Sequence, residues 1–248
     1  MHATRTPLQV WFWAAYLVTT QTPGQSASQF QRQLGLSRYE TAFQILHKLR
    51  SAMVRPDRDR IGGAWSVEID EAYVGGKTRG EGSGVHYKAY VAGAIEVRTK
   101  IERSLRRTIY AGRLRLQVVN SSCAKDLEAF TTENVEPKSH IITDGWVGYS
   151  GLTQLGYDHK PVVLGGDPEK TDKSLPMVHL VFSNLKAWLL GTHHGVSQQH
   201  LQAYLNEFVF RFNVRFYPMT AFNSVLGIAT QVEALTYEAL YEKSKYYI

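Results

Sequence analysis

The spacing of hydrophobic positions changes near residue 55. Before that point, apolar residues such as Ala42, Ile45 and Leu49 recur every three or four positions, which is typical of helices with one buried face. After it, β-branched and apolar residues alternate with polar ones in short runs bounded by glycine, which is typical of strands. A polar linker, VRPDRDRIGG, separates the two patterns. We therefore predict a helical region of residues 1–54 and a second domain of residues 55–248.

The second domain is predicted to alternate strands and helices. Strands are expected over 65–74, 87–97, 112–119, 139–144 and 160–164, and helices over 123–133, 175–190, 197–213 and 231–244. Three strands, a helix, further strands and closing helices follow the element order of a ribonuclease H-like fold. The fold class is therefore α/β, with a mixed sheet flanked by helices.

The N-terminal region is predicted to hold a helix over 7–19 and then two short helices joined at Gly35. Two interpretations of this pair remain open. One is a helix-turn-helix whose Arg38, Lys48 and Arg50 contact DNA. The other is a plain helical hairpin that packs on the main domain, because basic residues are not concentrated on the second helix.

Charge and cysteine content narrow the classes of protein. There are 28 Lys and Arg residues against 22 Asp and Glu, a formal charge of +6, which favours a polyanionic partner such as DNA. The single cysteine, Cys123, excludes an internal disulfide and a thiolate zinc site. The apolar run LQVWFWAAYLV is too short to span a membrane. We expect a cytoplasmic, nucleoid-associated protein.

Two aspartates, 74 positions apart, end strand-like runs. Asp70 closes SVEID and Asp144 closes SHIITD, and glycine follows soon after each. Carboxylates that converge at strand ends can hold divalent cations, which take oxygen ligands and assist phosphoryl transfer. Glu68 shares the strand face of Asp70 and could act in its place, whereas Glu71 points to the opposite face.

The third ligand position is ambiguous. His179 and Asn184 both follow in the helical run HLVFSNLKAWLLG, about 140° apart around the helix axis. A histidine nitrogen is a poor ligand for Mg²⁺ but acceptable to Mn²⁺, and asparagine offers only a neutral oxygen. Lys186 shares the helix face of His179, at the seventh position after it. His179 could equally be a helix residue bonded to the backbone.

Further basic residues could contact phosphates. Lys77 lies in the glycine-rich loop GGKTRGEGSGVHYK. Lys173 and Arg211 could add positive charge beside a scissile phosphate, together with Lys186. Glu207 is a reserve carboxylate, for which a salt bridge to Arg211 is the alternative interpretation.

The runs VEIDEAYVGGK, IITDGWVGY, HLVFSNLKAWLLGTHHGVS and HLQAYLNEFVFRFN, in this order, resemble bacterial insertion-sequence transposases of the group named fifteen-ninety-five, which carry the ISXO-two-like DDE domain. The resemblance implies a ribonuclease H-like domain that uses Mg²⁺ or Mn²⁺, two ions in all, to cut element ends and join the 3′ hydroxyl to target DNA. By position, Asp70 and Asp144 match the first two acidic residues, His179 or Asn184 the variable third, and Lys186 the lysine that follows. Because two ends must be paired, a homodimer or higher oligomer on DNA is expected.

The sequence departs from this family in two places. Members usually begin with a cysteine-rich zinc ribbon, which is absent here, and their FNRR motif reads Phe212, Asn213, Val214, Arg215, leaving Arg215 as the expected DNA contact. Both departures count against activity and the recognition of element ends. The absent zinc ribbon and His179 favour a second hypothesis, a decayed transposase that binds DNA without cutting it. A third is a nuclease of the same fold that cuts DNA and never joins it.

Overall fold

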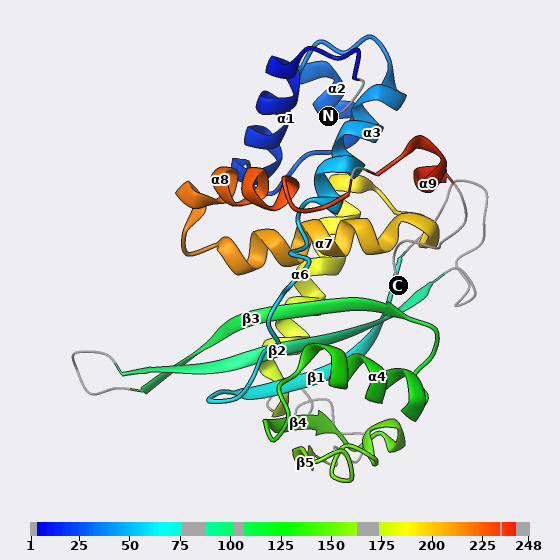
Figure 1. The fold of residues 1–248 in the computed structure, drawn as a ribbon. Coiled ribbons are helices and arrows are strands. Elements are labelled where there is room, and N and C mark those ends of the chain that lie inside the picture. Colours follow the sequence, from blue (N-terminus) through cyan, green and yellow to red (C-terminus); the bar gives the residue numbers. More distant parts are fainter. Residues whose placement is uncertain (1–3, 76–87, 102–106, 163–173, 234, 242–248) are drawn as a thin grey trace. The chain divides into compact units, whose positions relative to one another are not determined.

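The computed structural model describes residues 4–75, 88–101, 107–162, 174–233 and 235–241 (Figure 1). The chain divides into two compact units, one made of Met1–Arg58 with Trp188–Ile248 and the other of Asp59–Ala187. The first boundary lies close to the predicted one at residue 55. The second was not predicted, because the closing helices were assigned to the sheet domain. The division into domains 1–54 and 55–248 stays a prediction.

The unit Asp59–Ala187 is built on a five-stranded mixed sheet of order β3-β2-β1-β4-β5. β1 (Ser66–Val74), β2 (Ala89–Ile101) and β3 (Arg107–Val119) are antiparallel, whereas β4 (His140–Asp144) is parallel to β1, and β5 (Asp158–Val162) to β4. Together with its flanking helices, this α/β arrangement confirms the ribonuclease H-like fold.

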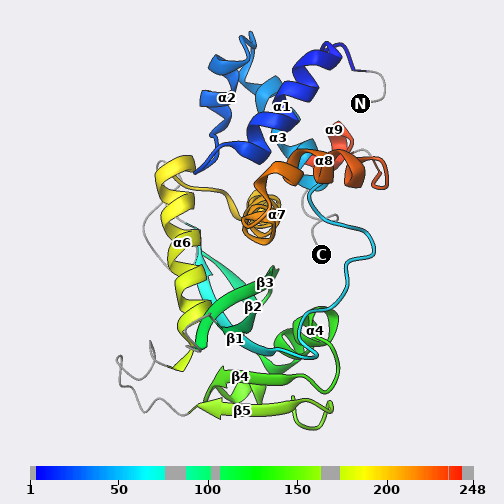
Figure 2. The same ribbon diagram turned by 90° about the vertical axis from the view of Figure 1, so that its left-hand side faces the viewer.

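Helices cover both faces of the sheet (Figure 2). α4 (Ala124–Asn134) and the short 3-10 helix η2 (Val147–Tyr149) lie on one face, where Leu127, Phe130 and Tyr149 pack on Val67 and Ile69 of β1. The first part of α6 (Pro176–His193) lies on the other face. Side chains alternate between the two faces along a strand, so only every second residue of β1 faces α6.

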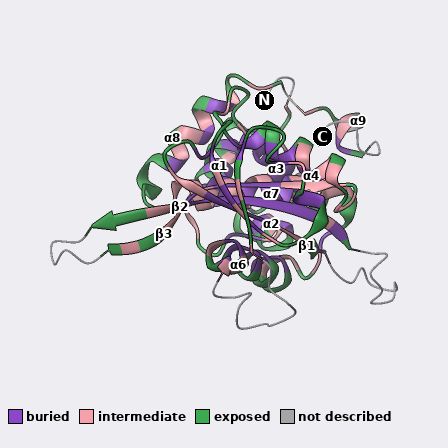
Figure 3. Cartoon of the chain, turned by 90° about the horizontal axis from the view of Figure 1, so that it is seen from below, coloured by how far each residue is buried: buried purple, intermediate pink, exposed green. Residues whose placement is uncertain are grey.

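The long β2–β3 hairpin extends past the cover of the helices. Residues Ala89–Glu96 of β2 are mostly buried, whereas Thr99–Ile101 are exposed (Figure 3). The sequence predicted shorter strands, ending at 97 and beginning at 112. The strands continue because Thr99 pairs with Ile109 and Lys100 with Thr108, so backbone pairing persists where alternation no longer marks a buried face.

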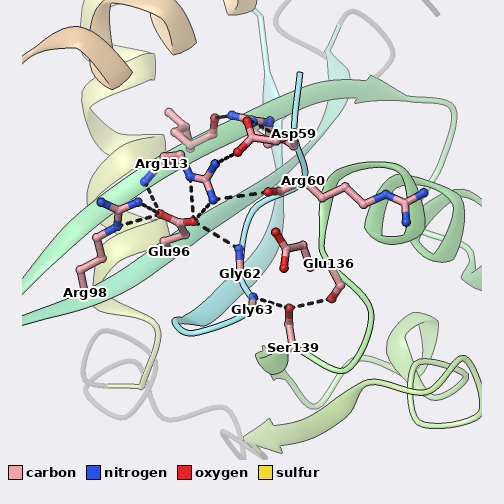
Figure 4. Close-up of polar contacts among 11 residues, drawn as sticks. Asp59, Arg60, Gly62, Gly63, Glu96, Arg98, Arg113, Glu136 and Ser139 are labelled. Atoms are coloured by element: carbon pink, nitrogen blue, oxygen red, sulfur yellow. Dashed lines mark hydrogen bonds and ion pairs between the residues drawn. The ribbon is translucent and has the colours of Figure 1, made fainter. Parts of the chain in front are cut away.

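Glu96 of β2 anchors the linker that leads into β1 (Figure 4). Its buried carboxylate accepts hydrogen bonds from the backbone N–H of Gly62, at 3.2 Å, and from the guanidinium groups of Arg98 and Arg113. Burial by itself would raise the pKa of Glu96, but these hydrogen bonds outweigh it and lower the pKa. Asp59 pairs with Arg113 in the same network. The chain is thereby held on the sheet just before the strand that carries Asp70.

The other unit is helical. α1 (Leu8–Thr20) packs against α8 (Pro218–Ala229), α2 (Ala27–Gln33) against α3 (Tyr39–Ser51), and α3 against α7 (Gln198–Val214), around one apolar core. Of the predicted helix over 231–244, the described residues show only the short segment Tyr237–Tyr241 as helix, and α8 was not predicted. α8 begins earlier, with Pro218 at its first position, and the short α9 (Tyr237–Tyr241) begins after Thr236, whose hydroxyl accepts the N–H of Ala239.

The two short helices at Gly35 exist as predicted, with Gly35 at φ +63° in the turn. The face of α3 with Leu46, Leu49 and Arg50 is buried in the core, and its first residues, Tyr39 and Glu40, are exposed. Among the described residues, no helix is long and apolar enough to cross a membrane.

Candidate functional site

Asp70 and Asp144 lie across from each other on neighbouring strands. The β1–β4 register pairs Val67 with Ile141 and Glu68 with Ile142, an offset of 74 positions, which is also the separation of the two aspartates. Continued by two residues, this register places Asp144 beside Asp70, with both side chains on the Glu68 face. After burial, the negative charge of Asp70 is a further cause that raises the pKa of Asp144, which agrees with this proximity.

Asp144 is held in a defined conformation at the end of β4. Its Oδ1 accepts the backbone N–H of Trp146 at 3.1 Å, the turn geometry that an aspartate before glycine favours. Burial raises the pKa of this carboxyl, and the charge of Asp70 raises it further. The hydrogen bond from Trp146 lowers it. Asp144 therefore forms the turn hydrogen bond to Trp146 and also lies beside Asp70.

His179 joins the pair from α6. Its Nε2 lies 3.3 Å from Oδ2 of Asp70, and both side chains are partly buried, with 22% and 16% of their surface exposed. A protonated His179 lowers the pKa of Asp144. Of the two candidates for the third position, the structure brings His179 to the aspartates. Asn184 is exposed five residues further along α6, about 140° around the helix.

Glu68 sets where α6 begins. Its carboxylate, which is 3% exposed, accepts the backbone N–H groups of Met177 and Val178 at 2.8 and 2.9 Å, satisfying two donors in the first turn of α6. His179 follows immediately. Oε2 of Glu68 is thereby engaged at the helix terminus, and the idea that Glu68 could act in place of Asp70 stays a prediction.

Gly93 lets α6 approach the sheet closely at this point. It pairs with Asp70 across β1 and β2, and a Cβ atom there would lie 2.9 Å from Cζ of Phe182 and 3.0 Å from Cδ2 of Leu116. Phe182 is one turn beyond His179. The glycine thus makes room for the helix residue that fixes the position of His179, a role with no motif to signal it in the sequence.

Glu71 lies on the opposite face of β1, as predicted, and accepts a hydrogen bond from the hydroxyl of Tyr149. The pKa of Glu71 is raised to about 7, mainly by burial and further by the charges of Asp70 and Asp144. The hydrogen bond from Tyr149 opposes this rise. Burial also raises the pKa of Glu68. Four carboxyl groups therefore lie close enough to repel one another.

This donor set fits a hard divalent cation. Carboxylate oxygens are the preferred ligands of Mg²⁺ and Mn²⁺, and a cation would offset both causes that raise the pKa of Asp144, burial first and the charge of Asp70 second. In the part of the chain that the structure describes, no group of three or more His, Cys, Asp or Glu side chains is arranged to hold an ion. The fit therefore rests on the pair Asp70 and Asp144, with His179 beside it.

The family model of the ISXO2-like transposase domain matches residues 61–213, more than half of the chain. The chain belongs to this family. The match contains Asp70, Asp144, His179 and Lys186, and a transposase domain implies DNA as a partner. No curated protein matches the chain.

Two of the predicted DNA contacts in this transposase are engaged inside the protein. Arg50 is 1% exposed, and its Nε donates to Oε2 of Glu207 at 2.8 Å, so its assignment as a DNA contact is wrong. Arg211 is largely buried; it donates to the carbonyl oxygens of Val18 and Gln21 and lies 3.6 Å from Glu207. Its guanidinium stabilises the helical core instead of facing DNA.

Glu207 is also corrected as a reserve carboxylate, because it is fully buried between the two arginines. The remaining contacts stay predictions. Arg38 and Lys186 are exposed, Lys48 lines a cavity of about 350 Å³ with Thr41 and Gln44, and Arg215 stacks on the rings of Phe212 and Phe216. Lys77 and Lys173 lie outside the described residues.

Proposed function

We propose that this chain is the transposase of an insertion sequence, which cuts DNA at the element ends and joins the freed 3′ hydroxyl to target DNA. The observation that carries the proposal is the juxtaposition of Asp70 and Asp144 in the β1–β4 register, inside the region that matches the transposase domain. Two adjacent carboxylates on neighbouring parallel strands, one in the middle of β1 and one at the end of β4, suit in-line phosphoryl transfer, with water as the first nucleophile and the 3′ hydroxyl as the second.

Asp70 and Asp144 would hold Mg²⁺ or Mn²⁺, which when bound activates the attacking oxygen and stabilises the leaving one. His179 has its Nε2 beside Asp70 and can orient that carboxylate, whatever the ion. Lys186, exposed two turns along α6 on the face of His179, can bind a phosphate oxygen of the DNA backbone. Tyr149 holds the Glu71 carboxyl on the far side of β1.

The test is a strand-transfer assay with Mn²⁺, labelled duplexes taken from the DNA that flanks the gene, and a supercoiled plasmid as target. The wild-type chain is expected to produce joined products, and Asp70→Ala and Asp144→Ala to lose them by roughly 100-fold or more. Asp158→Ala is the matched control, because Asp158 is exposed and pairs with His140 at 2.7 Å, away from the site. Equal activity of wild type and both site variants would refute the assignment.

A second function, DNA binding without cleavage, is favoured by the histidine at position 179. It leaves the site with one negative charge fewer than three carboxylates would supply, which weakens cation binding. A gel shift that persists while the chain makes no cut in either Mg²⁺ or Mn²⁺ would identify this function. Cleavage without joining would instead identify a nuclease of the same fold.

A further inference from the structure

Trp146 presents a large aromatic side chain to solvent two residues after Asp144. The indole is 46% exposed, and the next residue, Val147, is 69% exposed. A single exposed apolar residue needs no explanation by itself. These two, however, lie in the turn that follows β4, and the backbone N–H of Trp146 donates to Oδ1 of Asp144 at 3.1 Å. Trp146 therefore belongs to the same turn as one of the two site carboxylates.

One edge of the indole is held by the protein. Its Nε1 donates to the carbonyl oxygen of Ser122 at 2.8 Å, which engages the only polar atom of the ring. Gly148 makes room for this edge, since a Cβ atom there would lie 2.8 Å from Cδ1 and 2.8 Å from Nε1 of Trp146. The part of the ring that stays exposed is therefore apolar and is carried by a fixed edge.

The turn itself is anchored to the sheet. The backbone N–H of Tyr149 donates to the carbonyl oxygen of Trp146 at 3.1 Å, and the fully buried Tyr149 binds Glu71 of β1 through its hydroxyl. A planar side chain that is fixed before binding loses little conformational freedom when a ligand covers it. The turn thus offers a pre-organised flat surface beside Asp144.

The ligand that fits this surface is a nucleobase. A flat apolar ring without a free polar atom stacks on another flat ring, and bases are the flat groups of a DNA substrate. In a duplex both faces of a base are covered by its neighbours, so a side chain can stack only on a base that leaves the duplex or ends it.

The position of the base along the strand follows from the chain geometry. Asp144 and Trp146 are two residues apart, so their Cα atoms are separated by at most about 7 Å. Successive bases are about 3.4 Å apart along a DNA strand. A base on the indole therefore belongs to a nucleotide close to the phosphate that lies at Asp144.

We propose that Trp146 is a stacking platform for one unpaired base of the DNA, within a few nucleotides of the phosphate at Asp70 and Asp144. The inference rests on the proposed function, which brings DNA to these two aspartates. Stacking accepts every base, because every base has an aromatic face. Trp146 therefore holds the strand in place at the site without reading its sequence.

The experiment is a double-mutant cycle between the ring and the base, measured by equilibrium binding in Ca²⁺, which takes oxygen ligands as Mg²⁺ does. The probes are labelled duplexes taken from the DNA that flanks the gene, each with one abasic site at successive positions around the element boundary. Denaturing gels show that the probes stay uncut, and thermal melting shows that each variant is folded.

Three variants are compared with the wild-type chain. Trp146→Ala removes the ring. Trp146→Phe keeps an aromatic face without the Nε1–H group, so it separates stacking from the hydrogen bond to Ser122. Trp13→Ala is the matched control, because its indole is 59% exposed but lies on α1, in the helical unit.

On the intact probe, Trp146→Ala is expected to bind about 5–150-fold more weakly than wild type, which corresponds to the loss of one stack between a base and an aromatic ring. Trp146→Phe should retain most of the affinity, and Trp13→Ala should bind like wild type. At one abasic position the penalty of Trp146→Ala should disappear, because the base that stacks on the ring is already missing.

A penalty of Trp146→Ala that is absent, or equal at every abasic position, would overturn the proposal. Binding of Trp146→Phe as weak as that of Trp146→Ala would also overturn it, by assigning the effect to the hydrogen bond with Ser122. The strand-transfer assay separates this result from the proposed function. Joining without coupling refutes the platform alone, coupling without joining refutes the transposase activity alone, and a wild-type chain that binds none of the probes refutes both.

Discussion

Nε2 of His179 lies 3.3 Å from Oδ2 of Asp70, although the two residues come from a helix and a strand far apart in the sequence. The proximity is produced by two contacts between α6 and the sheet. Glu68 binds the first N–H groups of α6, and Gly93 admits Phe182 one turn later. The third position of the site is therefore determined by how α6 docks, and each contact can be tested.

Replacing His179 with glutamate should restore a third carboxylate beside Asp70. His179→Glu is expected to bind Mg²⁺ at least about tenfold more tightly, measured by calorimetry, and to extend any cleavage from Mn²⁺ to Mg²⁺. The matched control is Asn184→Glu, which adds the same charge about 140° around α6. If both variants gain the same affinity, the third ligand position is not at residue 179.

Adding one methyl group at Gly93 should disturb the docking of α6. Gly93→Ala is expected to destabilise the chain by about 1–3 kcal/mol, because its Cβ would press on Phe182 and Leu116. Phe182→Leu in the same background should recover part of that loss. Urea denaturation measures both changes.

Gly191→Ala, also tested by urea denaturation, is the control for this prediction. It lies in α6 with nothing within 4 Å of the added Cβ, and it should be neutral or stabilising by up to about 1 kcal/mol. Equal effects at the two glycines would show that the space above Gly93 is not limiting.

Removing the guanidinium of Arg50 should be among the most destabilising changes in the helical unit. Arg50→Ala leaves the buried carboxylate of Glu207 without its 2.8 Å partner, and we expect a loss of about 3–5 kcal/mol in unfolding free energy. The pair Arg50→Met with Glu207→Leu should cost less, since the buried carboxylate is removed together with its closest partner and only Arg211 loses its 3.6 Å contact. Arg32→Ala, an exposed arginine on α2, should change stability by less than about 0.5 kcal/mol and serves as the control. A similar effect of Arg32→Ala and Arg50→Ala would contradict the role of the ion pair.

Glu71 should make stability fall as the pH rises. Its pKa is raised from 4.5 to about 7 in the folded chain, so between these values the folded state holds a proton that the unfolded chain releases. The stability contributed by this proton is complete below pH 4.5 and is lost as the pH approaches 7.

Glu71→Gln keeps an acceptor for Tyr149 and carries no charge. Relative to wild type, it should gain about 1–3 kcal/mol between pH 4 and pH 8, a range reduced for partial solvent exposure. Urea titrations with EDTA at both pH values measure this difference, and exposed Glu40→Gln is the control. A difference from wild type that is the same at both pH values would contradict the raised pKa.

Much of the candidate site could be predicted from local pattern. Asp144 ends β4, as the alternating run before glycine predicted, whereas Asp70 lies in the middle of β1 (Ser66–Val74), so the prediction of a strand end is wrong for Asp70. Helical spacing likewise placed His179 and Lys186 on one face of a helix, and the helix exists as Pro176–His193. These features depend on neighbours within a few residues, which is the range over which sequence periodicity is informative.

The errors concern charged residues whose partners are distant. Arg50 is a basic residue near the end of a short helix, which made it a candidate DNA contact. Its partner in the structure is Glu207, which comes 157 positions later. Glu68, still a candidate ligand, has distant partners as well, because its Oε2 accepts N–H groups at the start of α6. Nothing in the local sequence distinguishes an arginine that faces DNA from one that neutralises a buried carboxylate.

The amino-acid sequence alone determined most of the strands and helices, the order that leads to a ribonuclease H-like sheet and the two aspartates on its strands, because backbone periodicity is a local property. The tertiary structure alone decided which helix residue lies beside those aspartates and which arginines are removed from the surface. Those outcomes depend on the register between strands and on the docking of helices, where burial and charge pairing act between residues that the chain separates widely.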